Sequence, residues 1–463
     1  MSERFSAAEA ARWCAGVWEP APPARVAGVT NDTRSLRPGE LYVALRGARC
    51  DGHAFVAEAF RRGACGALVE RGFAGAGAPE RPLLRCADPA LALRALARGY
   101  RERVAPLVIG VTGSAGKTTV KELTARLVAR ARRAAATRGN WNNEIGLPLS
   151  LLEMAPDTQV GVFELGISHP GEMRPLCEIL RPQWGIVSSL GRAHLEFFGS
   201  FERIAREKAE LFAALPPDGL AVFRADMPGA DILRRAAACE TVTVALEQDA
   251  DYSARRRKDG VWLAREARTG ETAELRLALP GPHQAANALL AAAVARRLGV
   301  SWTEIREALA AYGGLPLRWE IVWADGVRYV NDAYNANPES MRAALNAFAE
   351  EPAAGRQWLV LGDMLELGAA AEAEHRQLGA FAARGAWAGL ATVGALARGI
   401  ADGAEAAGFD PRRIWRCADA AEAAAVLRRQ TAAGDAVLLK ASRGVRLEEV
   451  LQRLTEGKEE RQP

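Results

Sequence analysis

A glycine-rich turn between an apolar strand and a helix constrains the fold of this chain most strongly. Residues 110–119 read GVTGSAGKTT and directly follow the apolar segment 107–111. After the turn, Val120, Leu123 and Leu127 recur at helical spacing. Such a turn directs backbone N–H groups at phosphate oxygens, and the N-terminus of the helix adds partial positive charge. The pattern therefore predicts a nucleoside triphosphate site on a parallel α/β sheet.

The residues of this phosphate loop have separate predicted roles. Lys117 is expected to reach the outer phosphates, and the Thr118 hydroxyl can bind Mg²⁺. The general form of such loops has its first glycine where this chain has Val111, so the loop is a tighter GxxGKTT variant. A chance GKT in a strand–helix turn is the alternative, but the flanking strand and helix argue against it. The expected nucleotide contacts are Thr112, Gly113, Ser114, Ala115, Gly116, Lys117, Thr118 and Thr119.

Composition excludes several classes of protein. Apolar residues make up 49% of the 463 residues, which is ordinary for about three globular domains. A net charge of +4, from 60 basic and 56 acidic side chains, is too balanced to predict a nucleic-acid partner. Residues 1–13 have no apolar signal core, and the most apolar helical stretch, 285–295, is too short to cross a bilayer. Seven cysteines without a CxxC pair indicate reduced, buried thiols in a cytoplasmic protein.

Two breaks divide the chain into three predicted α/β domains, 1–105, 106–315 and 316–463. The charged RERV before Pro106 marks the first break, and GGLPLRWE marks the second. The first domain mixes short strands and helices, the second has antiparallel strands within 252–279, and EGKEERQP at the end is expected to be disordered. Alternating strands and helices predict mostly parallel sheets, Rossmann-like in the third domain. The expected strands are 41–45, 107–111, 160–165, 185–190, 220–224, 328–331, 358–361, 391–393 and 436–440.

Two side chains follow strands of the second domain and are candidate metal ligands. Glu164 ends the strand VGVFEL, and a carboxylate at the carboxyl end of a parallel strand lies at the edge that carries the phosphate loop. Mg²⁺ prefers oxygen ligands, so Glu164 fits this ion, although a solvated glutamate is the alternative. His194 follows the strand GIVSSL, and a structural role is the common alternative for a single histidine.

Lysine is rare in this chain, which makes each one informative. Only six of the 60 basic residues are lysine, and the other 54 are arginine. Lys208 lies in the helical segment ERIAREKAELF, where the other two cations are arginines. A solvated helical lysine is one interpretation. The other is that CO₂ carbamylates this amine, which a guanidinium does not permit, and so creates an anionic ligand for Mg²⁺.

Together these segments resemble the Mur ligase family over nearly the whole chain. The DAYNANPES string is the most specific match, whereas the DNPR-type motif of the sister ligases that add diaminopimelate or lysine is absent. The matching motifs are NDTRSLRPGELYVALRGARCDGHAF (31–55), TGSAGKTT (112–119), TRGNWNNEIGLPLS (137–150), ELGISHPGE (164–172), GRAHLEFFGS (191–200), IAREKAELF (204–212), PLRWE (316–320), NDAYNANPESMRAAL (331–345), VLGDMLELG (360–368) and LLKASRG (438–444).

The resemblance implies an ATP- and Mg²⁺-dependent peptide ligase. Within the family, the sequence is most similar to members that add D-alanyl-D-alanine to UDP-N-acetylmuramoyl-tripeptide through an acyl phosphate. It implies a cytoplasmic monomer with no nucleic-acid partner and no membrane insertion. Thr118 and Glu164 would bind one Mg²⁺, while His194 and carbamylated Lys208 would bind another between phosphate and carboxylate.

The resemblance also assigns residues in the outer domains. In the first domain, which is similar to the family's UDP-sugar-binding domain, the UDP contacts would be Thr33, Arg34, Arg46 and His53. In the third domain, Arg318 and Asp332 would swing onto ATP, and domain closure would follow. Departures from the family pattern occur at Asn331, Gln284 and Ala441. The remaining expected contacts are Asn287 and Asn335 to the nucleotide, and Asn143, Asn337 and Lys440 to the peptide substrates.

Two rival functions remain at this point. One is a related ligase with another amine substrate, such as a diaminopimelate-adding enzyme or a folylpolyglutamate synthase. The other is a regulatory NTPase with a phosphate loop but no ligase activity. The UDP-type first domain argues against the regulatory NTPase, and no NKxD guanine motif is found.

Overall fold

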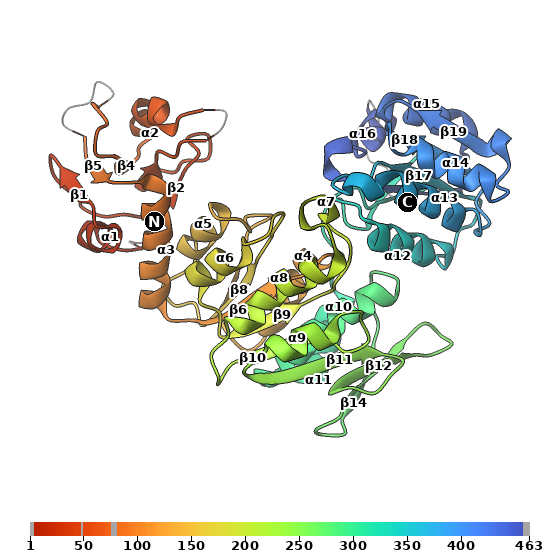
Figure 1. Ribbon diagram of the computed structural model, residues 1–463, viewed down its shortest axis with the longest axis horizontal. Coiled ribbons are helices and arrows are strands. Elements are labelled where there is room, and N and C mark those ends of the chain that lie inside the picture. Colours follow the sequence, from red (N-terminus) through yellow and green to blue (C-terminus); the bar gives the residue numbers. More distant parts are fainter. Residues whose placement is uncertain (1–3, 48–49, 76–80, 457–463) are drawn as a thin grey trace.

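The computed structural model describes residues 4–47, 50–75 and 81–456, which form three β-sheets with their own helices (Figure 1). The sheets follow one another along an extended molecule, with the nine-stranded sheet between the other two. This confirms the predicted α/β class with three domains. The predicted tail at 456–463 lies almost wholly outside the described residues. Within the described residues, no helix is long and apolar enough to span a bilayer.

The N-terminal sheet has five strands, of which only β1 runs antiparallel to its neighbour. In sheet order they are β1 (Val17–Glu19), β5 (Leu83–Cys86), β4 (Gly66–Glu70), β3 (Glu40–Val43) and β2 (Gly28–Thr30). The helices are α1 (Ala7–Cys14), α2 (Val56–Arg61), preceded by η1 (Gly52–Phe55), and α3 (Pro89–Val104). Asp88 caps α3 by accepting hydrogen bonds from Ala90 and Leu91, and the helix then runs to the start of the central sheet.

The central sheet is parallel from β7 to β12 and is extended by two antiparallel strands. In sheet order its strands are β14 (Thr272–Leu275), β13 (Trp262–Glu266), β12 (Tyr252–Arg256), β11 (Glu240–Leu246), β10 (Leu220–Arg224), β9 (Trp184–Val187), β6 (Leu107–Thr112), β8 (Val160–Glu164) and β7 (Ala134–Ala136). The helices are α4 (Lys117–Val128), α5 (Gly146–Leu152), α6 (Met173–Leu180), α7 (Leu195–Phe198), α8 (Phe201–Ala213), α9 (Ala230–Ala236), α10 (Pro282–Arg297) and α11 (Trp302–Ala310).

Strand order in the central sheet creates a crevice at β6. The chain places β7 and β8 on one side of β6 and then crosses over to place β9 and β10 on the other. Such a reversal leaves a crevice beyond the carboxyl ends of the strands. The alanine-rich helix α10 packs beside α4, and its residues 285–295 are all buried, which small side chains permit. The apolar stretch noted in the sequence is therefore a core helix.

The C-terminal sheet has six strands, with β15 antiparallel at one edge. In sheet order they are β15 (Glu320–Ala324), β16 (Val327–Asn331), β20 (Ala436–Lys440), β17 (Gln357–Gly362), β18 (Gly389–Val393) and β19 (Ile414–Cys417). The helices are α12 (Pro338–Ala349), α13 (Ala371–Ala382), α14 (Arg398–Ala406), α15 (Ala420–Gln430) and α16 (Glu449–Thr455), with 3₁₀ turns η2 (Gly368–Ala370), η3 (Pro411–Arg413) and η4 (Arg443–Val445).

The cysteines differ in part from the prediction. All seven are free, as expected, and Cys86, Cys177 and Cys417 are buried. Cys50, however, is exposed, and its carbonyl accepts a hydrogen bond from the Gly47 amide. The prediction that all seven are buried is therefore wrong. Burial raises the pKa of Cys177 to about 12, so this thiol stays protonated.

Helices α13 and α14 cross so closely that a glycine is required between them. A methyl group on Gly379 of α13 would lie 1.9 Å from the carbonyl oxygen of Ile400 in α14. We expect Gly379→Ala to destabilise the C-terminal domain by about 1–3 kcal/mol, as overpacking of a core does. Thermal unfolding measures this, with Gly72→Ala as the control, because nothing lies within 4 Å of a methyl group there. Equal melting temperatures for the two variants would contradict the proposed packing.

Candidate active site

Three loops meet at one edge of the central sheet, beside the C-terminal domain (Figure 1). The phosphate loop follows β6, Glu164 ends β8, and the segment from Ser188 to His194 follows β9. The strands β8, β6 and β9 are parallel neighbours, so their carboxyl ends coincide. The crevice at β6 therefore contains most of the residues predicted to bind nucleotide and metal.

The phosphate loop presents free backbone N–H groups. Gly116 has a φ of +79°, and a methyl group there would lie 2.6 Å from Asn287 Oδ1. Helix α4 begins directly after it without a side-chain cap, so its first amides are available to an anion. The loop is fixed from the β9 side, because Ser189 Oγ accepts from the Ala115 amide at 2.9 Å. The local geometry suits a phosphate group.

Lys117 forms a hydrogen bond with its own loop. Its ammonium donates to the Gly113 carbonyl at 2.9 Å. Burial lowers the pKa of Lys117; the Glu164 carboxylate opposes this shift, and the Arg318 cation adds to it. Lys117, Glu164 and Arg318 thus lie close enough to interact electrostatically. An anionic phosphate bound between the two cations would restore the preference of Lys117 for its charged form.

Glu164 has an oxygen that no protein group satisfies. The side chain is 2% exposed, and Oε1 accepts from Asn142 Nδ2 at 2.7 Å. Oε2 is buried without a hydrogen-bond partner. Because a buried unpaired carboxylate oxygen is costly, a cation is the natural partner, and an oxygen ligand fits Mg²⁺. No group of three or more His, Cys, Asp and Glu side chains in the described residues could hold a metal, so nucleotide oxygens would have to complete its coordination.

Lys208 is buried, which excludes the solvated interpretation. It lies on the inner face of α8, together with Ile204, Ala205 and Leu211, and is 2% exposed. Among the described residues it has no hydrogen-bond partner. Burial, with repulsion from Lys117, lowers the pKa of Lys208 well below its usual value against the attraction of Glu207. Two lysines therefore share one poorly solvated site.

His194 is held by the C-terminal domain. It has a left-handed φ of 59° at the start of α7, and its Nδ1 lies 2.6 Å from Glu366 Oε2. The pair is close enough for an ion pair, although the angle does not satisfy hydrogen-bond geometry for Nδ1. The contact with His194 lowers the pKa of Glu366. Glu366 belongs to the VLGDMLELG motif, which by itself predicts no role for this side chain.

Arg318 crosses from the C-terminal side onto the phosphate loop. Its guanidinium donates to Thr118 Oγ1 at 2.9 Å and lies 4.0 Å from the ring centre of Tyr334. Asn337, the N-cap of α12, also reaches the loop at the Ser114 carbonyl, at 3.5 Å. The structure thus brings these two residues to the loop.

Other residues of the C-terminal domain that were predicted to contact ligands form hydrogen bonds with one another. Lys440 is 4% exposed and donates to Asp332 at 2.6 Å and to the Asn335 carbonyl at 3.1 Å. The side chain of Asn335 accepts from the Ala336 amide. In the central domain, Asn143 is exposed, and its side chain accepts hydrogen bonds from the Ile145 and Gly146 amides at the start of α5. For all four residues, ligand contact stays a prediction.

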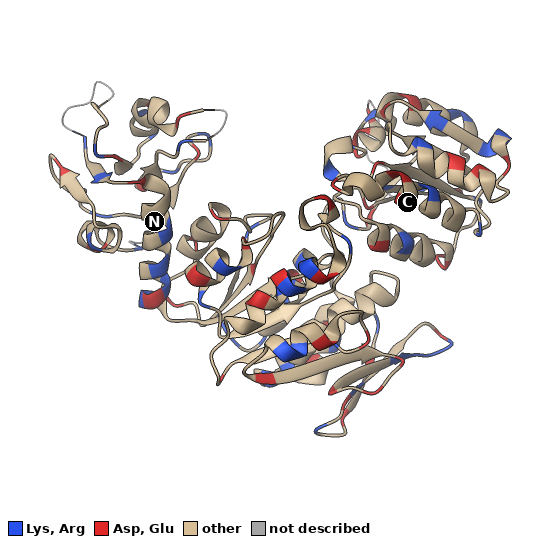
Figure 2. Cartoon of the chain, viewed as in Figure 1, with Lys and Arg blue, Asp and Glu red and all other residues tan. Residues whose placement is uncertain are grey.

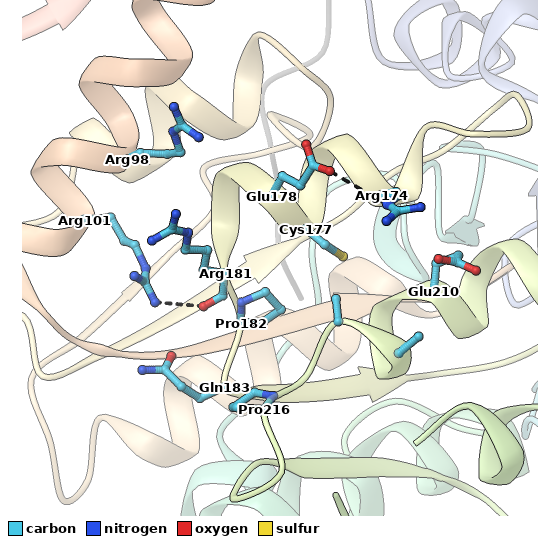
Figure 3. Close-up of a pocket in the computed structure, with 12 residues that line it drawn as sticks. Arg98, Arg101, Arg174, Cys177, Glu178, Arg181, Pro182, Gln183, Glu210 and Pro216 are labelled. Carbon is cyan, nitrogen blue, oxygen red and sulfur yellow. Dashed lines mark hydrogen bonds and ion pairs between the residues drawn. The ribbon is translucent and has the colours of Figure 1, made fainter. Parts of the chain in front are cut away.

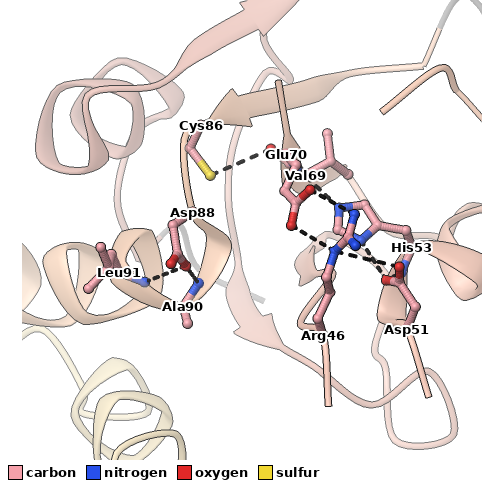
Figure 4. Close-up of polar contacts among 9 residues, drawn as sticks. All are labelled: Arg46, Asp51, His53, Val69, Glu70, Cys86, Asp88, Ala90 and Leu91. Carbon is pink, nitrogen blue, oxygen red and sulfur yellow. Dashed lines mark hydrogen bonds and ion pairs between the residues drawn. The ribbon is translucent and has the colours of Figure 1, made fainter. Parts of the chain in front are cut away.

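The predicted UDP residues lie in the N-terminal domain, and Figure 4 shows two of them, Arg46 and His53. His53 is buried: Nε2 accepts from the Glu70 amide at 3.1 Å, and Nδ1 lies 2.7 Å from Asp51. Arg46 makes an ion pair with Glu70 at 2.8 Å. Both side chains therefore support the loops. Thr33 and Arg34 lie at the surface, where Arg34 pairs with Asp32.

A separate cavity of about 730 Å³ lies between α3, α6 and α8 (Figure 3). Four arginines line it: Arg98, Arg101, Arg174 and Arg181. It also contacts Gln183, whose side chain accepts from the Val108 amide at the amino ends of β6 and β9. The cavity thus lies at the opposite end of the strands from the phosphate loop, and we do not assign the active site to it.

Comparison with known proteins covers all three domains. Residues 25–101 match the model for the Mur ligase family catalytic domain, 111–295 the Mur ligase middle domain, and 317–443 the Mur ligase glutamate ligase domain. The UDP-N-acetylmuramoyl-tripeptide--D-alanyl-D-alanine ligase of Bacillus subtilis is 34% identical over 93% of both chains. Its Escherichia coli counterpart is 38% identical over 76% of this chain and 77% of its own.

Solved structures agree with these matches. A crystal structure of MurF from Acinetobacter baumannii has a TM-score of 0.87 and 29% identity, over 98% of this chain and 99% of that one. MurF from Thermotoga maritima in complex with ADP has a TM-score of 0.78 and 30% identity, over 92% of this chain and 96% of that one.

Lys117 supplies the positive charge of the phosphate loop, so its loss should abolish turnover. We expect Lys117→Ala to lower ATP-dependent turnover at least about 10²-fold, as the loss of a preorganised electrostatic contact does. Circular dichroism and melting temperature should be unchanged. Lys258→Ala, at an exposed turn, is the matched control and should keep full activity. Near-normal turnover of Lys117→Ala would contradict the assignment of the loop.

Proposed function

This chain belongs to the Mur ligase family, and we propose that its site joins D-alanyl-D-alanine to UDP-N-acetylmuramoyl-tripeptide with ATP, a step of peptidoglycan precursor synthesis. One observation carries this assignment: relatives with that activity align with 93% of the chain, not with the phosphate loop alone. The chain is therefore an ATP-dependent peptide ligase. A regulatory NTPase is excluded, because all three ligase domains are present.

The reaction couples phosphoryl transfer to amide formation. The γ-phosphoryl group of ATP passes to the terminal carboxylate of the tripeptide, which gives an acyl phosphate and ADP. The amine of the dipeptide attacks the acyl carbon, and the tetrahedral adduct loses inorganic phosphate and a proton to leave the amide. Lys117, Arg318 and the amides at the start of α4 would neutralise and orient the phosphates. The ADP complex of the Thermotoga maritima relative supports nucleotide binding in this fold.

Magnesium ions would neutralise phosphate charge during the transfer. For the first, Thr118 supplies a hydroxyl and Glu164 supplies its unpaired Oε2. For the second, His194 and a carbamate on Lys208 are the ligands we propose. His194 contacts Glu366 through Nδ1, so Nε2 would be the nitrogen that binds this ion while Glu366 orients the ring.

Carbamylation of Lys208 would remove the repulsion between Lys208 and Lys117 at this buried site. The neutral amine adds CO₂ to give a carbamate anion and a proton, and the product carries a negative charge beside Lys117. A buried amine would thereby become an anionic ligand with two oxygens. An unmodified Lys208 that faces the acyl phosphate as a cation is the alternative.

The outer domains would hold the two peptide substrates. We propose that Thr33 and Arg34 contact the UDP group, with Arg46 and His53 supporting the same loops. Asn143, Asn337 and Lys440 are the proposed peptide-side contacts, and Asn287, Asp332 and Asn335 the further nucleotide contacts. The enzyme would act in the cytoplasm, where ATP and UDP-linked precursors are found. It would act as a monomer, because one chain supplies both the phosphate loop and Arg318.

The amine substrate separates this enzyme from its sister ligases. We expect phosphate release to require both UDP-N-acetylmuramoyl-tripeptide and D-alanyl-D-alanine, because the acyl phosphate needs an amine acceptor. Free diaminopimelate and glutamate, tested with each UDP-muramoyl peptide, should give no release. Equal rates with either amino acid would show that the chain is a different ligase.

Replacement of Lys208 distinguishes a carbamate from a cation. We expect Lys208→Ala to be inactive and partly rescued by acetate, which supplies carboxylate oxygens. Lys208→Arg should be equally inactive, since it keeps the charge but cannot be carbamylated. Lys117→Ala is the control and should show no rescue by acetate. Full activity of Lys208→Arg would contradict the carbamate and leave Lys208 as a simple positive charge.

A further inference from the structure

Lys121 is a fully buried lysine that the reaction described above does not use. It lies one helical turn after Lys117 in α4, and its side chain is 0% exposed. A buried ammonium is costly unless hydrogen bonds compensate it. The chain otherwise uses arginine for 54 of its 60 cations, so a compact ammonium at this position points to a specific contact.

The ammonium of Lys121 holds the segment that follows β7. It donates to the Thr137 carbonyl at 2.6 Å and to Glu122 Oε1 at 2.5 Å. Thr137 is 2% exposed, whereas the Glu122 side chain is about one-third exposed. The contact with Thr137 is therefore the better shielded of the two. Lys121 thus joins the helix of the phosphate loop to the edge of the sheet.

Thr137 in turn holds the backbone of Glu164. The Thr137 hydroxyl accepts from the Glu164 amide at 2.9 Å, and the Thr137 amide donates to the Val162 carbonyl at 3.1 Å. These two bonds fix Thr137 against the last residues of β8. A continuous chain of hydrogen bonds therefore leads from Lys121 through Thr137 to Glu164.

The same segment orients the carboxylate of Glu164. Asn142, five residues after Thr137, donates to Glu164 Oε1, and its carbonyl accepts from the Gly166 amide at 2.9 Å. One carboxylate oxygen is therefore occupied, and Oε2 is left without a partner. The segment from Thr137 to Asn142 therefore determines which carboxylate oxygen of Glu164 has no hydrogen-bond partner.

We propose that Lys121 is a positioning residue that, through Thr137, aligns the free oxygen of Glu164 with the metal–nucleotide complex on the phosphate loop. This inference rests on the proposed role of Glu164 as a magnesium ligand. Lys121 contacts neither nucleotide nor metal in this scheme. Its removal should weaken the coupling between Mg²⁺ and nucleotide, because residues that orient a metal ligand typically change metal affinity 10–100-fold.

The experiment compares ADP affinity with and without Mg²⁺, by calorimetry on the full chain. In Lys121→Met, which keeps the volume and removes the charge, the gain in ADP affinity from Mg²⁺ should fall at least about tenfold. ADP affinity without Mg²⁺ should change less than threefold. Thr137→Val, which removes only the hydroxyl that Glu164 uses, should reduce the same gain. Glu122→Gln is the matched control and should keep it, because Lys121 still reaches the Thr137 carbonyl.

Coupling between the two variants tests the chain of contacts. If Lys121 acts through Thr137, the double variant should lose no more of the gain than the larger single variant does, whereas independent effects would multiply. A lower melting temperature with an unchanged gain from Mg²⁺ would show that Lys121 only stabilises the fold, and would overturn the proposal. If Lys121→Met does not fold, Thr137→Val provides the test. An unchanged gain in ADP affinity from Mg²⁺ in Thr137→Val would then overturn the proposal.

Glu164→Gln separates this inference from the assignment on which it rests. If Glu164→Gln keeps the full gain from Mg²⁺, the metal role of Glu164 is wrong, and the role proposed for Lys121 falls with it. If Glu164→Gln loses the gain while Lys121→Met and Thr137→Val both keep it, the metal assignment stands and only the positioning role is wrong.

Discussion

The parallel pairing of β6 with both β8 and β9 is the constraint on which the site depends. It brings the phosphate loop, Glu164 and the His194 segment to one edge, although they span more than 80 residues of sequence. Because the register fixes where each strand ends, a slip of one residue would turn Glu164 to the other face of the sheet. The positions of the reactive side chains therefore depend on the pairing register of these strands.

Local sequence patterns predicted the elements whose residue periodicity or glycine spacing is visible within the element itself. The GxxGKTT turn and the strands β6, β8, β9 and β10 were located to within a few residues, because periodicity and glycine spacing are local, whereas β11 was not predicted. The short strand β19 was missed, since only its first and last residues are buried and it contains the exposed Arg416. Cys50 shows the same limit: composition predicted a buried thiol, whereas Cys50 is exposed in the structure.

Local sequence patterns could not predict the contacts between domains. Nothing near His194 in the sequence indicates that Glu366 lies against it. Within the central domain, the hydrogen bond from Lys121 to Thr137 likewise joins two separate segments. The C-terminal domain reaches the site mainly through polar groups: Arg318 on Thr118, Asn337 on Ser114, and Arg192 paired with Glu374. Polar contacts of this kind can be exchanged for ligand or water at low cost, so they suit a surface that opens and closes.

The scarcity of lysine has a practical consequence for labelling the protein. Of the five lysines in the described residues, only Lys258 is exposed; Lys121, Lys208 and Lys440 are buried, and Lys117 is partly covered by its own loop. Figure 2 shows the lysines and arginines together in blue, spread over all three domains. Lys258 lies on the turn between β12 and β13, in the antiparallel extension of the central sheet. An amine-reactive dye or surface linker should therefore couple there in preference to the catalytic crevice. The chain carries a natural attachment point from which domain motion can be followed without an engineered cysteine.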